Sequence, residues 1–220
     1  MTFASDGAQR FAAALDQAGL ESIEVAIAKL PAGKAGLRLQ GLPALSTVLA
    51  PSGAVGWIPA YVLGETCRPV RAVLFDKTSA TNWSLAWHQD RTIAVAERRE
   101  VAGFGPWTVK NGMLHVTPPV AILAGMVTLR AHLDAVPMSN APLLVAPGSH
   151  RLGRISENDV PRVVAACGVA ACLAEAGDVW LYSTPILHAS KAAAEPRRRR
   201  VLQVDFATGE LPGGLRWLGV

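Results

Sequence analysis

The sequence predicts a mainly β protein with flanking helices, arranged as an antiparallel sandwich or barrel. Half of the 220 residues are apolar and 17% are charged, so the chain can bury a sizeable core. Short strand-like segments separated by turns follow one another through residues 68–207. Apolar residues at helical spacing are concentrated before residue 68. We therefore expect one domain over residues 1–220, with a mainly helical part at 1–65 and the β core at 68–207.

The N-terminal part begins with a predicted helix. Ser5 is expected to cap it, and Phe11, Leu15 and Leu20 recur near helical spacing. Residues 39–64 carry no charge, but a membrane-spanning helix needs about 20 continuous apolar residues. Five helix-breaking residues interrupt this segment: Pro43, Pro51, Gly53, Gly56 and Pro59. We expect buried loop and short helix here, with no membrane partner.

The β core is expected to contain several short strands and one helix. Residues 156–167 are predicted to form a capped helix or a lid-like insertion. In residues 125–134 the side chains alternate, so that Thr128, Arg130 and His132 share a face. The predicted strands lie within residues 68–77, 85–90, 92–100, 125–134, 141–150, 177–183, 186–190 and 199–207.

Composition excludes several classes of function. The formal net charge is +4, and it is inflated by four consecutive arginines at 197–200. Because no basic stripe is interleaved with aromatic residues, a nucleic-acid partner is not expected. The first 20 residues do not resemble a signal peptide, and three scattered cysteines suit reduced thiols in the cytoplasm. A serine hydrolase is not favoured, since the chain lacks a G-x-S-x-G motif.

The motif "WHQD" carries a candidate pair of metal ligands. In a strand His88 and Asp90 point to the same side, about 6.5 to 7 Å apart along the chain. An imidazole and a carboxylate can take neighbouring positions on an octahedral ion. A third ligand completes a triangular face and leaves the other positions open, as in non-haem Fe(II) oxygen chemistry. Taken alone, the pair also fits a solvated strand face.

The third ligand has four candidates: His115, His132, His150 and His188. His188 lies between an apolar strand and a basic one, and Arg199 follows it by eleven residues. A hairpin between them would bring a guanidinium into the cavity that holds the metal. A guanidinium can hold a carboxylate through two parallel hydrogen bonds, so His188 with Arg199 suits a metal beside an acidic co-substrate.

These residues resemble the phytanoyl-CoA dioxygenase-like (PhyH) family of Fe(II)- and 2-oxoglutarate-dependent oxygenases. The resemblance covers about residues 68–207 and rests on "WHQD", "LVAPGSHRLG", "GDVWLYSTPILHAS" and the distal His–Arg spacing. It implies a double-stranded β-helix, the jelly-roll or cupin-like barrel. It also implies a dioxygenase, an oxidoreductase that uses Fe(II), 2-oxoglutarate and O2. Such an enzyme would hydroxylate a small-molecule substrate and release succinate and CO2.

The resemblance also assigns roles within the site. It makes His88, Asp90 and His188 the iron ligands. Arg199, helped by Ser190, would bind the distal carboxylate of 2-oxoglutarate, and Trp107 would line the same pocket. Within the arginine run, spacing and strand parity select Arg199, although Arg197 shares that parity. The residues expected around the substrate are Lys77, Asn82, Lys110, His115, Arg130 and His132.

Two other functions remain open from the sequence. One is a cupin-type metal enzyme, an isomerase or dioxygenase, that does not use 2-oxoglutarate. The other is a non-catalytic metal-binding module of the same fold. Arg199 separates the first from the main prediction, because such an enzyme has no need of a carboxylate anchor. Asp90 favours hydroxylation over halogenation, since halogenases of this type replace the carboxylate with a small residue. Substrate identity and oligomeric state stay open.

Overall fold

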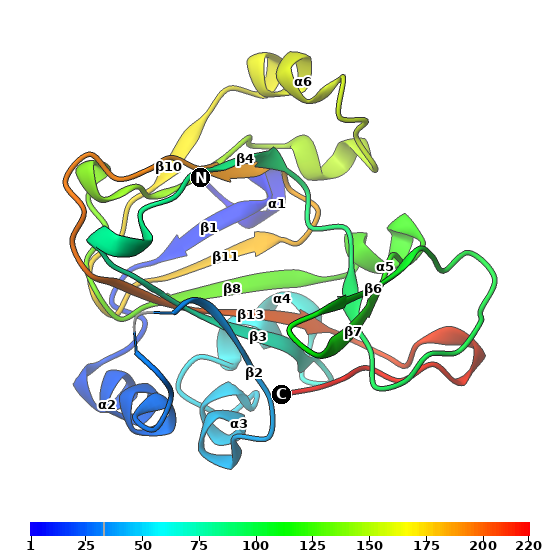
Figure 1. The fold of residues 1–220 in the computed structure, drawn as a ribbon, viewed down its shortest axis with the longest axis horizontal. Coiled ribbons are helices and arrows are strands. Elements are labelled where there is room, and N and C mark those ends of the chain that lie inside the picture. The colour runs from blue at the N-terminus through cyan, green and yellow to red at the C-terminus, as the bar shows by residue number, and fades with distance from the viewer. Residues whose placement is uncertain (33) are drawn as a thin grey trace.

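The computed structural model describes residues 1–32 and 34–220 and is built around a six-stranded antiparallel sheet, the major sheet (Figure 1). Its strands, in spatial order, are β1 (Ala8–Phe11), β11 (Val179–Ser183), β8 (Val127–His132), β13 (Arg199–Ala207), β3 (Arg68–Lys77) and β2 (Ala35–Leu39). Strands far apart in sequence are therefore neighbours, and β13 lies in the middle of the sheet between β8 and β3.

A four-stranded minor sheet faces the major sheet. Its order is β10 (Ala170–Cys172), β9 (Leu143–Val145), β12 (His188–Ser190) and β4 (Leu85–His88). A third sheet has the order β5 (Ile93–Ala94), β7 (Met113–Val116) and β6 (Trp107–Lys110). In the part of the chain that the structure describes, the ladders of the major and minor sheets do not join. The arrangement is an open jelly roll, which confirms the predicted mainly β fold class.

Helices cover the outer face of the major sheet. Figure 1 shows α2 (Gln17–Ile27), α3 (Pro43–Leu49) and α4 (Trp57–Leu63) on the side away from the minor sheet. The short helix expected within 39–64 is thus confirmed as two short helices. None of the described helices is both long and apolar enough to cross a membrane. The remaining helices are α1 (Phe3–Asp6), α5 (Val120–Ala124), α6 (Val160–Cys167) and the 3-10 turns Ser79–Thr81, Met138–Asn140, Ser149–Leu152 and Pro212–Gly214.

Strand β13 shows why the site lies between the two sheets. Successive side chains of a strand point to opposite faces. Leu202, Val204 and Phe206 are buried in the core under the helices. Gln203 and Asp205 are also buried, but they point to the opposite face, toward the minor sheet. The alternation places apolar side chains against the helices and polar side chains in the interior of the jelly roll.

The predicted N-terminal helix is wrong in its position. Residues Ala8–Phe11 form β1, which pairs with β11 at the edge of the major sheet, and α2 begins only at Gln17. The Asp16 side chain caps α2 by accepting a hydrogen bond from the Gly19 amide (2.8 Å). Phe11 and Leu15 do reach the core under the helices. The apolar spacing therefore marked burial correctly, but a ladder with a distant strand overrode the helical pattern.

The strands and the helix predicted for the β core mostly agree with the structure. Strands β3 and β13 span the predicted ranges 68–77 and 199–207, and α6 confirms a helix within 156–167. The expected strand at 92–100 is reduced to Ile93–Ala94. β2 was not predicted, and with β1 it supplies the two edges of the major sheet. The N-terminal part thus contributes strands as well as helices.

Candidate metal and co-substrate site

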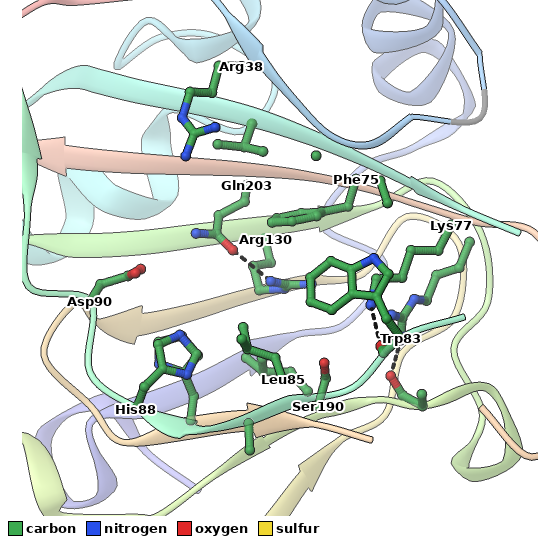
Figure 2. A pocket seen from close by; sticks show the side chains of 18 of the residues that line it. Arg38, Phe75, Lys77, Trp83, Leu85, His88, Asp90, Arg130, Ser190 and Gln203 are labelled. Carbon is green, nitrogen blue, oxygen red and sulfur yellow. Dashed lines mark hydrogen bonds between the residues drawn. The ribbon is translucent and has the colours of Figure 1, made fainter. Parts of the chain in front are cut away.

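Three candidate ligands meet at the edge of the minor sheet. His88 ends β4 and His188 begins β12, and the two residues are paired in the antiparallel ladder. Their ring centroids lie 4.2 Å apart. Asp90 follows two residues after the end of β4. One ligand atom from each of the three side chains lies within 4.8 Å of the others, close enough to hold one metal ion. Figure 2 shows His88 and Asp90 on the wall of the same cavity.

Both imidazoles are held with the same nitrogen turned away from the cluster. His88 Nδ1 lies 2.8 Å from the carbonyl oxygen of Ala86, and His188 Nδ1 lies 2.9 Å from that of Ile186. A carbonyl only accepts, so each Nδ1 carries the proton and each Nε2 keeps its lone pair for a ligand. Burial lowers the pKa of His188 to about 4, which favours the neutral ring that a metal requires. The donor set fits a divalent iron ion.

Arg71 on β3 holds the carboxylate of the cluster. Its Nη2 donates to Asp90 Oδ2 (3.2 Å) and its Nε donates to Asp205 Oδ2 (2.6 Å). Thr128 donates to the other oxygen of Asp205 (3.0 Å). Burial raises the pKa of Asp90, but the charge of Arg71 outweighs it, together with the two histidines when they are protonated in acid, and the pKa falls to about 2. Asp90 is therefore ionised and oriented before any metal binds.

The three side chains line a cavity of about 300 Å³ between the sheets. Arg199 and Ser190 line it as well. The guanidinium of Arg199 is buried and donates to the carbonyl oxygens of Asn140 and Ala141. Among the described residues it has no carboxylate partner. Burial lowers the pKa of Arg199 to about 10, and the charge of Arg130 adds to this effect, so a bound carboxylate would relieve both costs.

The neighbours of Arg199 point elsewhere. Arg198 pairs with Asp76 on the opposite face of the sheet (3.0 Å), and Arg200 pairs with Asp134 (2.7 Å). Arg197, which shares the parity of Arg199, is exposed before β13 begins. Of the four arginines, the structure brings only Arg199 to the cavity wall.

Three of the residues expected around the substrate line this cavity: Lys77, Lys110 and Arg130. Arg130 donates to Gln203 Oε1 (2.6 Å). Lys77 Nζ lies 3.7 Å from the centre of the Trp83 ring and donates to the Trp83 carbonyl (3.1 Å). Burial, reinforced by the charges of Arg199 and Arg130, lowers the pKa of Lys77 to about 8. Figure 2 shows Lys77 and Trp83 at one side of the cavity and Asp90 at the other.

Four expected site residues lie away from the cavity wall. Trp107 belongs to β6 and packs in the cluster around Phe104 and Val116, because the third sheet turns it away. Asn82 exchanges two hydrogen bonds with the backbone of Ala193 (3.0 and 2.7 Å) and fixes a loop. His115 is fully buried beside the Met113 carbonyl (2.9 Å).

His132 is the fourth of these residues. It is 2% exposed, and neither ring nitrogen has a hydrogen-bond partner among the described residues. Burial lowers its pKa to about 3, so the ring is neutral. His132 shares a face of β8 with Arg130, as expected, but it is buried and does not line the cavity. The sequence thus placed His132 on the same face of the strand as Arg130, but it did not indicate that His132 is buried.

Several cavity residues were not predicted: Arg38, Arg71, Trp83 and Gln203. Gln203 has the strand parity of Arg199, so the alternation of β13 could have identified it. Arg38 and Arg71 reach the site because β2 pairs with β3, and β3 pairs with β13. That pairing has no local signal in the sequence.

Comparisons with known proteins agree with this geometry. The model of the family described as phytanoyl-CoA dioxygenase (PhyH) matches residues 43–201. Among curated proteins no sequence matches.

Solved structures are similar in fold. The fold resembles EctD from S. alaskensis with bound Fe (TM-score 0.69, 16% identity, 99% of this chain and 78% of that chain). It also resembles HygX from Streptomyces hygroscopicus with nickel and 2-oxoglutarate bound (TM-score 0.63, 16% identity, 94% of this chain and 84% of that chain). A third similar structure is the non-heme alpha ketoglutarate dependent carbocyclase SnoK from nogalamycin biosynthesis (TM-score 0.66, 15% identity, 99% of this chain and 85% of that chain). At these identities the likeness supports the jelly-roll fold.

Proposed function

Because the chain belongs to the phytanoyl-CoA dioxygenase family, we propose that it uses Fe(II), 2-oxoglutarate and O2 to hydroxylate a small molecule, releasing succinate and CO2. The observation that carries this proposal is the meeting of two imidazoles and a carboxylate within 4.8 Å, in the same cavity as Arg199. The solved structures of HygX and EctD contain 2-oxoglutarate or iron in a similar fold, which supports the same cofactors here.

Each candidate ligand has an assigned atom. His88 and His188 would bind Fe(II) through Nε2, because Nδ1 of each faces a backbone carbonyl. Asp90 would bind through its carboxylate while Arg71 holds it in place. A facial set of three ligands leaves positions open for the co-substrate and O2. The bound metal supplies the oxidation that couples decarboxylation of 2-oxoglutarate to insertion of oxygen into a substrate C–H bond.

The other residues of the cavity orient the co-substrate. Arg199 would hold the distal carboxylate of 2-oxoglutarate through two charge-assisted hydrogen bonds, and Ser190 on β12 would donate a third. The carbonyls of Asn140 and Ala141 fix the guanidinium before binding. Pre-organised donors lose little entropy when the ligand arrives, so the distal carboxylate sets the position of the keto acid.

Apolar side chains complete the cavity wall. Phe75 on β3, Leu143 on β9 and Leu85 on β4 line it from both sheets. Apolar side chains offer water no hydrogen bonds, so a bound co-substrate and substrate would displace water from this part of the cavity. Exclusion of water strengthens the electrostatic contacts within a site and protects reactive species from side reactions.

Arg199 also weighs against a cupin-type enzyme that does not use 2-oxoglutarate. A buried guanidinium without a carboxylate partner is costly, and such an enzyme would have no use for it. Asp90 supports hydroxylation over halogenation, because its side chain occupies the position that a halide would need. The intact ligand cluster weighs against a non-catalytic module.

The test is an anaerobic titration of the protein with Fe(II) and 2-oxoglutarate. We expect the weak visible charge-transfer band of a keto acid chelated to Fe(II). Oxygen should then yield succinate, with more when a substrate is added. A protein that binds Fe(II) without developing the band would contradict the use of 2-oxoglutarate. A protein that develops the band but never forms succinate would support the non-catalytic module.

A further inference from the structure

The cavity carries more positive charge than the metal and the co-substrate would use. Six cationic side chains line it: Arg38, Arg71, Lys77, Lys110, Arg130 and Arg199. Against them stand Asp90 and, behind the wall, Asp205, both paired with Arg71. Fe(II) would add two positive charges, and 2-oxoglutarate would add two negative ones. The excess of positive charge would remain, and it favours the binding of a further anion.

The cations form two groups. Lys77 and Arg199 are opposite each other in the ladder of β3 and β13, and with Arg130 they surround the proposed place of the distal carboxylate. Arg38 and Lys110 lie on the other side, near Asp90 and Arg71, whose charges act on both of them. The second group is nearest to Asp90 among the candidate ligands, and the co-substrate would not use it.

Arg38 and Lys110 keep donors free for a ligand. Arg38 comes from the edge strand β2 and makes no hydrogen bond or ion pair within residues 1–32 and 34–220; its Nε is shielded from water. Lys110 comes from β6, and its ammonium donates one hydrogen bond to Thr92 Oγ1 (3.1 Å). Both side chains are half-buried. Figure 2 shows Arg38 across the cavity from His88.

Arg71 differs from these two. Its Nε donates to Asp205 and its Nη2 donates to Asp90, and it is 9% exposed. It therefore positions the candidate ligand Asp90, while Arg38 and Lys110 remain for a molecule that enters from solvent. A guanidinium and an ammonium that converge on one space suit an oxyanion.

We infer that the substrate is a small molecule with an anionic oxygen group, a carboxylate or a phosphate, which Arg38 and Lys110 hold while the rest lies over the metal. The inference rests on the proposed function, since it assumes that Arg199 is occupied by 2-oxoglutarate. The cavity of about 300 Å³ also has to hold 2-oxoglutarate, so the anionic group and the reacting part of the substrate share it with the co-substrate.

A screen of matched compounds tests this substrate class. The enzyme is loaded with Fe(II) and saturating 2-oxoglutarate, and succinate formation is measured. Each carboxylic acid is paired with its methyl ester, and each phosphate monoester with its parent alcohol. We expect the anionic member of a pair to be consumed, and comparison of the two series identifies which oxyanion is recognised. The inference is overturned if neutral members are consumed as readily, or if no anionic compound raises succinate above the rate without substrate.

Substitutions assign the contact to these residues. For the best anionic compound, Arg38→Gln and Lys110→Met should each raise KM about tenfold or more, the effect of losing one charge-assisted hydrogen bond. Arg38→Lys should recover part of the loss. Arg98→Gln is the control, because it removes one charge from an exposed side chain paired with Glu100. An unchanged KM in both cavity variants would overturn the assignment.

The charge-transfer band separates failure of this inference from failure of the proposed function. Its absence in the unsubstituted protein would contradict the proposed use of 2-oxoglutarate. Its presence, together with equal turnover of acids and esters, would contradict only the anionic substrate. The band also shows whether each variant still assembles the site.

Discussion

His88 and His188 are cross-strand partners on β4 and β12, with their ring centroids 4.2 Å apart. A hundred residues separate them in sequence, and one antiparallel pair brings them together. Each ring is oriented by the carbonyl oxygen two residues before it. The same hydrogen bond to a backbone carbonyl thus occurs once on each strand, and it leaves both Nε2 atoms free for a ligand.

We expect His188→Ala to abolish tight binding of Fe(II). The variant removes one of the three candidate ligands, and His188 is 5% exposed, so water replaces the imidazole poorly. Metal content after anaerobic loading and gel filtration measures the effect. His150→Gln is the matched control, since His150 packs against Gly7 and lies outside the cluster. Retention of stoichiometric iron by His188→Ala would remove His188 from the ligand set.

Arg199→Ala should mainly weaken the binding of 2-oxoglutarate. Loss of a bidentate, charge-assisted contact costs about 1.5 to 3 kcal/mol, which corresponds to a rise in Kd of about tenfold to a hundredfold. The Fe(II) affinity should change much less, because Arg199 contacts none of the candidate ligands. Titration of the charge-transfer band with 2-oxoglutarate measures the first quantity, and titration with Fe(II) measures the second. Arg197→Ala is the control, and equal Kd values in the two variants would refute the anchor.

Arg71→Met should destabilise the protein as well as impair the metal site. It leaves the buried carboxylate of Asp205 without its ion pair and frees Asp90. Removing one partner of a buried pair typically costs about 3 to 5 kcal/mol. Urea unfolding measures the loss of stability, and Fe(II) titration should show weaker binding. The double variant Arg71→Met with Asp205→Asn should recover part of the stability, because the unpaired charge is gone.

The lowered pKa of Lys77 predicts how the stability of the fold depends on pH. Its pKa in the folded protein is about 8, below the ordinary value of 10.5, so the unfolded chain holds the proton more tightly. Between these two values the unfolded state binds more protons, and the contribution of Lys77 to folding stability becomes more favourable as the pH rises. The free energy of unfolding of the wild type should therefore rise relative to that of Lys77→Met from pH 8 to pH 10.5. A constant difference between the two proteins across this range would show that the Lys77 ammonium is not desolvated.

The sequence determined much of the site through strand parity. The alternation in residues 199–207 put Arg199 on one face and the apolar Leu202 and Val204 on the other, and β13 has that alternation. The spacing of His88 and Asp90 also predicted that they lie together, and their ligand atoms meet, although β4 ends at His88 and Asp90 lies just beyond the strand. Period-two alternation is a local property of an extended chain, so it can be read before any tertiary contact is known.

Only the tertiary structure decided which strands became neighbours. Phe11 looked helical but lies in β1, because the ladder with β11 outweighed a weak local preference. Trp107 looked like a pocket residue but belongs to a separate sheet. Arg38 and Arg71 carried no local signal, yet pairing of β2 with β3 and of β3 with β13 brings them to Asp90. Pairing of distant strands depends on burial and backbone hydrogen bonding across the whole fold, which no short stretch of sequence encodes.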